Sequence, residues 1–506
     1  MESVRARVPT EDSKIAFLGD KTHLYDRLLH LELDRPRPRA ARLFSWMERA
    51  RAQSLWDRAR DPNHWSGEAA LPRERRSQEL RQRISWLHAR VSRLELGTES
   101  ERKHARELRQ ELARAERDWA ESLRRGGEAG ARRRRGPRPE EEAETGFAAM
   151  IPELPEGWGF LSYHLGSGVS LALAVTSRGV LWRSLSPDLS DRVARLADRL
   201  DFQWAAAAAS SAHGASTAAG AGPSPLLCAS TDSILRELYK LLWRPLEEAG
   251  IPPDLSWMVS PHGPLHRLPL PALLGPQGYL AQGRDFAIVP SARAWRELPR
   301  ARSQPVRRAW IAGTPSEGLP AVRLEMDRVP ARLQGWSVVR DFAPTRKALY
   351  AAGAKAGLIH LAAHGFLRAD NPFYSHLLLA DGPLFVHDLR GLRLSGATVV
   401  LTACSSGRGA SPAGDEWIGL ARGFLLAGAS AVVASLWPIE DAATVELMDR
   451  FYQEWARGTG TAPALARAMR GMIPDRAHPW HWASFAVLGG IPGPARQSRA
   501  ILRHLR

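Results

Sequence analysis

The second half of the sequence alternates short, continuously apolar runs with amphipathic segments, and this alternation restricts the fold more than any other feature. The apolar runs that predict strands are 309–312, 336–340, 358–363, 398–403, 431–436 and 484–488. The segments that predict helices are 322–334, 346–356, 416–429, 441–457 and 463–472. Because such strands must be covered on both faces, we predict an α/β fold with a mainly parallel sheet flanked by helices.

Residues 147–300 predict a more varied arrangement. Apolar runs at 160–165, 169–176 and 180–185 are separated by short glycine turns, which favours antiparallel hairpins. Further elements are expected as a helix at 188–201, a helix at 231–249, a strand at 255–260, a folded turn at 261–274 and, later in the chain, a hairpin at 376–388. The Ala/Gly/Ser-rich run 205–225 offers little to bury, so we interpret it as a flexible insertion.

The first part of the chain is expected to be helical. Segment 15–30 carries leucines near helical spacing, and segment 41–60 has an apolar side formed by Leu43, Phe44, Met47 and Leu55. Two heptad-like stripes follow on either side of Gly97, from Leu80 to Leu94 and from Ala105 to Trp119, and they predict an antiparallel helical hairpin of coiled-coil type. A plain two-helix packing unit without a partner is the alternative. Each apolar stripe needs a covering surface, from this chain or from another protein.

With 506 residues, the chain is long enough for two to four domains. We divide it into five segments: a helical N-terminal segment (1–123), a flexible charged linker (124–146), a first α/β lobe (147–300), a second α/β lobe (301–493) and a basic tail (494–506). The linker contains a basic run followed by an acidic run and has no apolar periodicity.

The formal net charge of +16 raises the question of a nucleic-acid partner, with Arg132–Arg135 as the candidate contact. Only six of the 70 basic residues are lysines, which is typical of a GC-rich genome. We therefore favour a solvated surface and hinge over a dedicated nucleic-acid site.

The chain contains two cysteines, Cys228 and Cys404, which excludes a disulfide scaffold and a cysteine-based zinc site. No apolar run reaches the ~18 residues of a membrane-spanning helix, and the N-terminus lacks the apolar core of a secretory signal. We expect a reducing, cytoplasmic setting without a membrane span.

Two predicted strands end in residues that can perform nucleophilic chemistry. The strand 358–363 is followed by His364 and Gly365, and the strand 398–403 by Cys404. Functional groups gather at the carboxyl ends of parallel strands, so neighbouring strands would bring His364 and Cys404 together. A thiol and an imidazole at one place form a nucleophile with its general base. Taken singly, a cysteine ending a strand is usually part of the core, and His-Gly is common in turns.

These two segments resemble the CHAT domain, a bacterial branch of the caspase and separase group of cysteine peptidases. The resemblance covers about 150–490. The segments that carry it are PHGPLHRLPLPAL (261–273), PSAR (290–293), HLAAHGFL (360–367), VVLTACSSG (399–407), GLARGFLLAGASAVVASLWPIEDAAT (419–444) and HPWHWASFAVLGG (478–490). The helical segment 15–123 is similar to the stretch between helical repeats and CHAT domains, but we find no 34-residue repeat ahead of it.

The resemblance implies a role for each matching residue. Cys404 would be the nucleophile and His364 the general acid/base. The backbone N–H groups of Gly365 and Cys404 would hold the oxyanion. No metal or organic cofactor is implied. Asp415 or Glu416 would select a basic substrate residue if either lined the substrate pocket, although we favour the alternative that Asp415 caps a helix and Glu416 stabilises its positive end.

The resemblance also implies that the first lobe is an inactive counterpart of the second. His262-Gly263 is a candidate remnant of a site, but no cysteine accompanies it. We interpret His262, His266 and Cys228 as structural. We expect Trp437, Trp480 and Trp482 to be core or groove walls.

The leading hypothesis is therefore a caspase-like cysteine endopeptidase that acts on a protein substrate. It would be latent until a protein partner acts on its N-terminal helices. The alternative is a catalytically silent CHAT signalling scaffold that binds proteins through its helical N-terminal part.

Overall fold

The computed structural model describes most of the two predicted lobes and part of the N-terminal region. The described residues are 22–51, individual positions between 80 and 118, and 153–214, 223–297, 306–315, 321–366, 375–386, 388–402, 420–437 and 441–491. The predicted linker 124–146 and tail 494–506 lie outside them. The chain forms two compact units, one of Thr22–Ala52 with Arg138–Arg506 and one of Met1–Lys21 with Gln53–Pro137.

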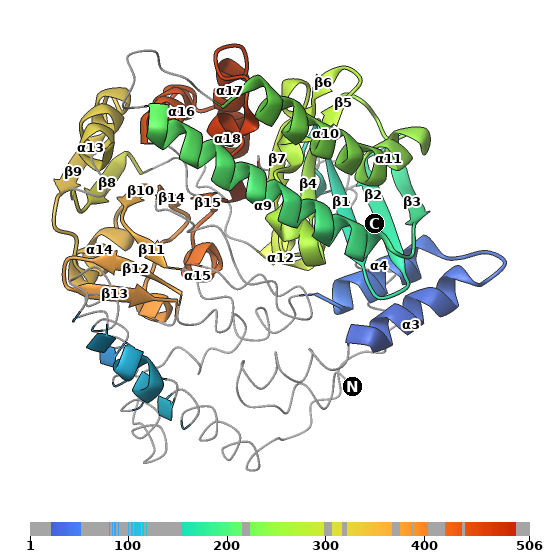
Figure 1. Ribbon diagram of the computed structural model, residues 1–506, viewed down its shortest axis with the longest axis horizontal. Helices are drawn as coiled ribbons and strands as arrows, with labels where there is room; N and C mark the ends of the chain where they lie inside the picture. The colour runs from blue at the N-terminus through green and yellow to red at the C-terminus, as the bar shows by residue number, and fades with distance from the viewer. Residues whose placement is uncertain are drawn as a thin grey trace, which may run out of the picture. The chain divides into compact units, whose positions relative to one another are not determined.

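Within the described residues, eleven strands of the larger unit form one sheet (Figure 1). In order across the sheet they are β3 (Gly179–Leu185), β2 (Ser170–Thr176), β1 (Trp158–Leu165), β4 (Ser256–Ser260), β7 (Phe286–Ile288), β16 (Phe485–Gly489), β15 (Ala431–Ser435), β14 (Thr398–Leu401), β10 (Leu358–Ala362), β8 (Arg308–Gly313) and β9 (Ser337–Asp341). Most neighbours are parallel, which confirms the predicted fold class.

Three neighbouring pairs in the sheet are antiparallel: β1–β2, β2–β3 and β15–β16. The first two form the predicted hairpins, and Gly168 in the first turn has φ +76°, a conformation that favours glycine. The third pair reverses strand direction at the junction of the two lobes. The strands β1, β4 and β7 therefore run opposite to β8, β10, β14 and β15.

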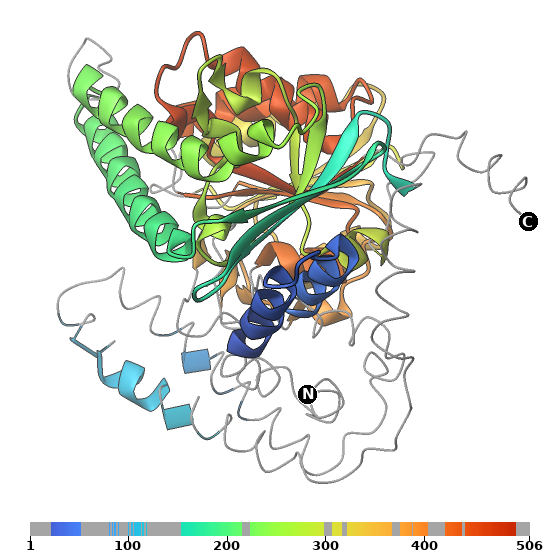
Figure 2. The same ribbon diagram turned by 90° about the vertical axis from the view of Figure 1, so that its right-hand side faces the viewer.

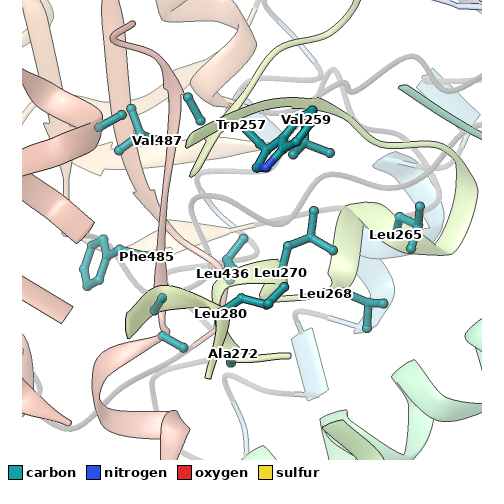
Figure 3. Packing of buried hydrophobic residues seen from close by; sticks show 14 of the residues in the cluster. Trp257, Val259, Leu265, Leu268, Leu270, Ala272, Leu280, Leu436, Phe485 and Val487 are labelled. Carbon is teal, nitrogen blue, oxygen red and sulfur yellow. The ribbon is translucent and has the colours of Figure 1, made fainter. Parts of the chain in front are cut away.

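The last strand, β16, joins the two lobes. It pairs with β15 of the second lobe over five residues and with β7 of the first lobe through Leu488 and Ile288. A continuous core lies on this junction (Figure 3). The 3₁₀ turns of segment 263–272 contribute Leu268 and Leu270, which pack near Leu436 and Phe485 of the second lobe.

Helices cover both faces of the sheet, as predicted. They are α3 (Thr22–Leu33), α4 (Ala40–Arg49), α9 (Leu189–Gly214), α10 (Pro225–Leu242), α11 (Arg244–Glu248), α12 (Ala292–Glu297), α13 (Ala321–Arg332), α14 (Arg346–Gly353), α15 (Leu420–Leu426), α16 (Asp441–Trp455), α17 (Thr461–Met472) and α18 (Pro479–Trp482). Figure 2 shows α9, α10, α16 and α17 on one side of the sheet and α3 with α4 on the other.

The predicted flexible insertion at 205–225 is wrong for residues 205–214, which are helical, whereas residues 215–222 lie outside the described residues. Helix α9 continues to Gly214, and α10 begins at Pro225 after Ser224, whose side chain accepts a hydrogen bond from the N–H of Leu227. Alanine has the highest intrinsic helix propensity, so an alanine run extends a helix that is already formed. The buried ring of Trp204 stacks on Trp437 and holds this part of α9 on the core.

The N-terminal region is divided differently from the single segment 1–123 that the sequence suggested. Helices α3 and α4 belong to the unit that contains the sheet, whereas Gln53–Pro137 belongs to the other unit. In that second unit, Leu87, Leu112 and Ala115 of the predicted apolar stripes are buried. A 2.7 Å ion pair between Arg83 and Glu111 links the two helical stretches.

Candidate active site

His364 lies just beyond the carboxyl end of β10. Its backbone carbonyl accepts a 2.8 Å hydrogen bond from the N–H of Leu378, which joins it to the hairpin of β12 (His376–Leu379) and β13 (Gly382–Phe385). The side chain is half-buried, and desolvation lowers the pKa of His364 below its ordinary value. The imidazole is therefore neutral near pH 7, which is the form that accepts a proton.

The strand that precedes Cys404 is the neighbour of β10. Strands β10 and β14 are parallel, with Leu361 opposite Leu401. The N–H of Thr402 donates a 3.2 Å hydrogen bond to the carbonyl of Leu361. The two strands are thus neighbours, which is the condition that the sequence argument required. Cys404 itself lies outside the described residues, as do Asp415 and Glu416.

Gly365 begins the short strand β11 (Gly365–Phe366), which pairs with β12. Leu378 bonds to His364, so these two residues occupy a hydrogen-bonded position of the antiparallel pair. The next pair, Gly365 with Leu377, is then a non-hydrogen-bonded position. The N–H of Gly365 consequently points away from β12.

A buried polar network lies beneath the ends of β10 and β14, and the sequence reasoning missed it. His360 is fully buried, and its Nε2 lies 3.0 Å from Glu325 Oε2 and its Nδ1 2.9 Å from the Tyr452 hydroxyl. The hydroxyl of Thr402 donates a 2.7 Å hydrogen bond to the same Glu325 oxygen. The histidine within the apolar run LIHLA was the available signal, because a buried imidazole requires partners.

The partners in this network define the direction of its hydrogen bonds. A carboxylate oxygen accepts, so Glu325 Oε2 is placed to accept a proton carried on His360 Nε2, and the Tyr452 hydroxyl lies within hydrogen-bond distance of Nδ1. Burial and the nearby charge of Glu325 raise the pKa of Tyr452 well above its ordinary value, so this hydroxyl stays protonated.

A second polar cluster lies at the carboxyl ends of β1 and β4 in the first lobe. The rings of His164 and His262 are 4.3 Å apart, and His262 Nδ1 accepts a hydrogen bond from the N–H of Leu165. Arg51, which follows α4, donates hydrogen bonds of 2.6 Å to the hydroxyls of Ser162 and Ser260. The residue that follows α4 thus bonds to residues near the carboxyl ends of two adjacent strands.

Burial has the largest effect on the pKa values of the histidines in this cluster. Desolvation lowers the pKa of His164, although its hydrogen bond to Asp26 opposes that shift. Desolvation, reinforced by His164 and Arg51, lowers the pKa of His262 well below its ordinary value. Burial also lowers the pKa of His266 to about 3. All three histidines are therefore neutral near pH 7, and the hydrogen bond and ring contact of His262 agree with the structural role predicted for it.

The remaining residues singled out in the sequence lie within the packed structure. Cys228 is half-buried on α10, with its sulfur 3.8 Å from the carbonyl of Pro223, and desolvation raises its pKa. Trp437, Trp480 and Trp482 are all buried, and the indole N–H of Trp437 donates to the carbonyl of Trp480. These tryptophans are core residues.

The sequence profile of the CHAT domain family matches residues 232–490, just over half of the chain. This chain belongs to the CHAT domain family. The matched CHAT region begins within α10, includes both β10 and β14, and ends after β16. Among the described residues, no group of three or more His, Cys, Asp or Glu side chains has the arrangement of a metal site, and no helix is long and apolar enough to cross a membrane.

Two curated relatives match shorter parts of this CHAT protein. Tetratricopeptide repeat protein 28 of Mus musculus is 36% identical over 104 residues, which are 20% of this chain and 4% of that protein. The Homo sapiens protein of the same name is 34% identical over 123 residues, which are 24% of this chain and 5% of that protein. The chain therefore spans a small fraction of the length of these relatives.

Similar solved structures include two of the Saccharomyces cerevisiae separase–securin complex. One matches with a TM-score of 0.47 and 10% identity over 69% of this chain and 31% of the other. The second has a TM-score of 0.45 and 12% identity over 94% and 37%. Gingipain R, an Arg-specific cysteine proteinase, matches with a TM-score of 0.36 and 12% identity over 54% of this chain and 70% of its own.

Proposed function

We propose that this CHAT domain protein is a caspase-like cysteine endopeptidase. The observation that carries the proposal is the parallel pairing of β10 with β14, fixed by the hydrogen bond from Thr402 to Leu361. This pairing brings the ends of two strands together, one leading to His364 and the other to Cys404. The order and spacing of these two residues then supply an imidazole and a thiol to one edge of the sheet.

The proposed chemistry follows from the state of His364. Its lowered pKa keeps the imidazole neutral, so it can take the proton of the Cys404 thiol. The thiolate attacks the substrate carbonyl, and the tetrahedral intermediate expels the leaving amine, which takes its proton from His364. The resulting thioester is hydrolysed by water with His364 as the base.

The oxyanion of the intermediate is assigned to backbone N–H groups. The register of β11 against β12 directs the N–H of Gly365 away from the hairpin, which makes it available to a substrate oxygen. The second donor in the proposal is the N–H of Cys404. We retain Asp415 and Glu416 as candidates for a pocket that selects a basic substrate residue.

The proposed activator would act through the N-terminal helices. Helices α3 and α4 are bonded to the first lobe through Asp26 and Arg51. The helices of the other unit follow Arg51 in the chain. A protein that binds them would therefore act on a segment that is covalently continuous with residues anchored on the sheet.

The test is a comparison of new protein N-termini in host-type lysate between wild type and Cys404→Ala, each co-expressed with neighbouring gene products. Termini that depend on Cys404 support the peptidase and show its cleavage preference. Cys228→Ala is the matched control and should leave the same termini in place. If wild type yields no new termini beyond those of Cys404→Ala with any of the neighbouring gene products, the signalling scaffold replaces this proposal.

A further inference from the structure

A single carboxylate oxygen connects the two strands that lead to the proposed catalytic residues. Oε2 of Glu325, on α13, accepts from the hydroxyl of Thr402 at 2.7 Å and from Nε2 of His360 at 3.0 Å. His360 is on β10, four positions before His364, and Thr402 follows β14, two positions before Cys404. Glu325 therefore contacts both strands close to their carboxyl ends.

We propose that Glu325 is a positioning residue that sets the separation of Cys404 and His364 through Thr402 and His360. This inference rests on the proposed function, because the separation of Cys404 and His364 matters only if they react as a nucleophile and its base. At Thr402 the backbone of β14 bonds to β10, and the side chain of the same residue bonds to Glu325. Thr402 is thus fixed at two points immediately before the chain continues to the nucleophile.

The burial of Glu325 argues for such a role. Its side chain is 4% exposed, and His360 is fully buried. Removing charged groups from water is unfavourable, and well-packed apolar residues often stabilise a core as well as a buried ion pair does. A fully bonded polar network does, however, specify one arrangement of the groups that it joins. The reacting atoms of a nucleophile and its base must lie within hydrogen-bond distance, so a defined arrangement has a direct catalytic value.

Thr402 offers the sharpest test, because two substitutions separate its hydroxyl from its size. Thr402→Val removes the hydroxyl and keeps the shape, whereas Thr402→Ser keeps the hydroxyl and removes a methyl group. The readout is the rate at which iodoacetamide alkylates Cys404 in the full-length protein between pH 5 and pH 9, followed by mass spectrometry. Cys228 in the same chain is the internal reference for reagent and fold.

We expect Thr402→Val to lower the alkylation rate of Cys404 at pH 7 by about tenfold. The midpoint of the rate as a function of pH should move towards ~8.5, the pKa of an unassisted thiol. Thr402→Ser should stay within about twofold of wild type at the same pH, and the rate at Cys228 should not change. Thr402→Ala, which also lacks the hydroxyl, replaces the valine variant if that protein does not fold. In a peptidase assay, loss of the Thr402 hydroxyl should reduce kcat and leave KM unchanged.

Two results would overturn the proposal: a valine or alanine variant with the wild-type pH profile, or a serine variant as impaired as the valine variant. His364→Ala distinguishes this failure from failure of the proposed function. If His364→Ala leaves the profile of Cys404 unchanged, there is no thiol–imidazole pair and both proposals fail. If His364→Ala changes the profile and the Thr402 variants do not, only the positioning role is wrong.

Discussion

Asp26 Oδ1 and His164 Nε2 lie 2.7 Å apart, although 138 positions separate these residues in the sequence. The second carboxylate oxygen of Asp26 accepts from the N–H of Ser167, in the turn after β1. One side chain of α3 therefore bonds to both the end of a central strand and the turn that follows it. Helices α3 and α4 are consequently part of the α/β fold.

Arg51 provides the strongest test of this attachment. Burial lowers its pKa to about 10, so it is still charged near pH 7, beside the half-buried Glu48, whose pKa burial raises. We expect Arg51→Met to reduce the free energy of unfolding by about 2–4 kcal/mol, because the buried hydroxyls of Ser162 and Ser260 both lose a charged hydrogen-bond donor. Urea denaturation measures the loss. Arg244→Met breaks the exposed pair with Glu248 and should change the same quantity by less than about 1 kcal/mol. Equal effects of the two substitutions would contradict the buried attachment.

Stability should decrease as the pH falls below about 6.5. Burial lowers the pKa of His478 and of His481 to about 4, while the unfolded chain keeps the ordinary value of 6.5. Between these values the unfolded state binds more protons, so each histidine contributes a slope of about 1.4 kcal/mol per pH unit. Urea denaturation at pH 7.5, 6.5, 5.5 and 5.0 gives the slope. His478→Asn retains an acceptor for the N–H of Trp480 and should remove about one such contribution. A flat profile in this range would show that these histidines titrate normally.

The peptidase activity should persist in mildly acidic solution. The proposed base must be neutral, and burial lowers the pKa of His364 from 6.5. We therefore expect kcat/KM to fall with a midpoint below pH 6.5. Cleavage rates of a peptide identified from the new N-termini, measured from pH 5 to 8, give this midpoint. A midpoint above pH 6.5 would mean that the charged form of His364 is stabilised rather than desolvated.

The helical extension of α9 can be tested at Ala205, an exposed position within it. Ala205→Gly should lower the free energy of unfolding by about 1 kcal/mol, and Ala205→Pro by about 3 kcal/mol or more, because the residue is helical. Both values come from urea denaturation. In a flexible insertion neither substitution would measurably change the free energy of unfolding. A loss that is larger for proline than for glycine therefore supports the helix.

Most strands and helices could be predicted because their apolar residues repeat over short distances. The runs at 358–363 and 398–403 became β10 and β14, and the parallel order followed from their continuous hydrophobicity. The alanine run after Trp204 was misinterpreted because its low complexity resembles a linker, whereas its packing depends on a distant tryptophan.

The polar contacts behind the candidate site could not be predicted in the same way. Glu325 meets Thr402 across 77 positions, and Arg51 meets Ser260 across 209. No local pattern marks these pairs, because each residue resembles an ordinary surface residue within its own segment. His364 and Cys404 could be selected as candidates because each follows a predicted apolar strand. The residues that hold those two strands together are known only from the fold.

The position of β16 has a consequence for the order in which the sheet can be completed during synthesis. This strand lies between β7 and β15, yet it is the last strand of the sheet to leave the ribosome. Its contact with Ile288 closes a loop of 200 residues, and such distant contacts form slowly. Until residues 485–489 emerge, β7 and β15 each have an unpaired edge. A nascent chain arrested before this point would hold two incomplete sheets, and the emergence of residues 485–489 joins them into one.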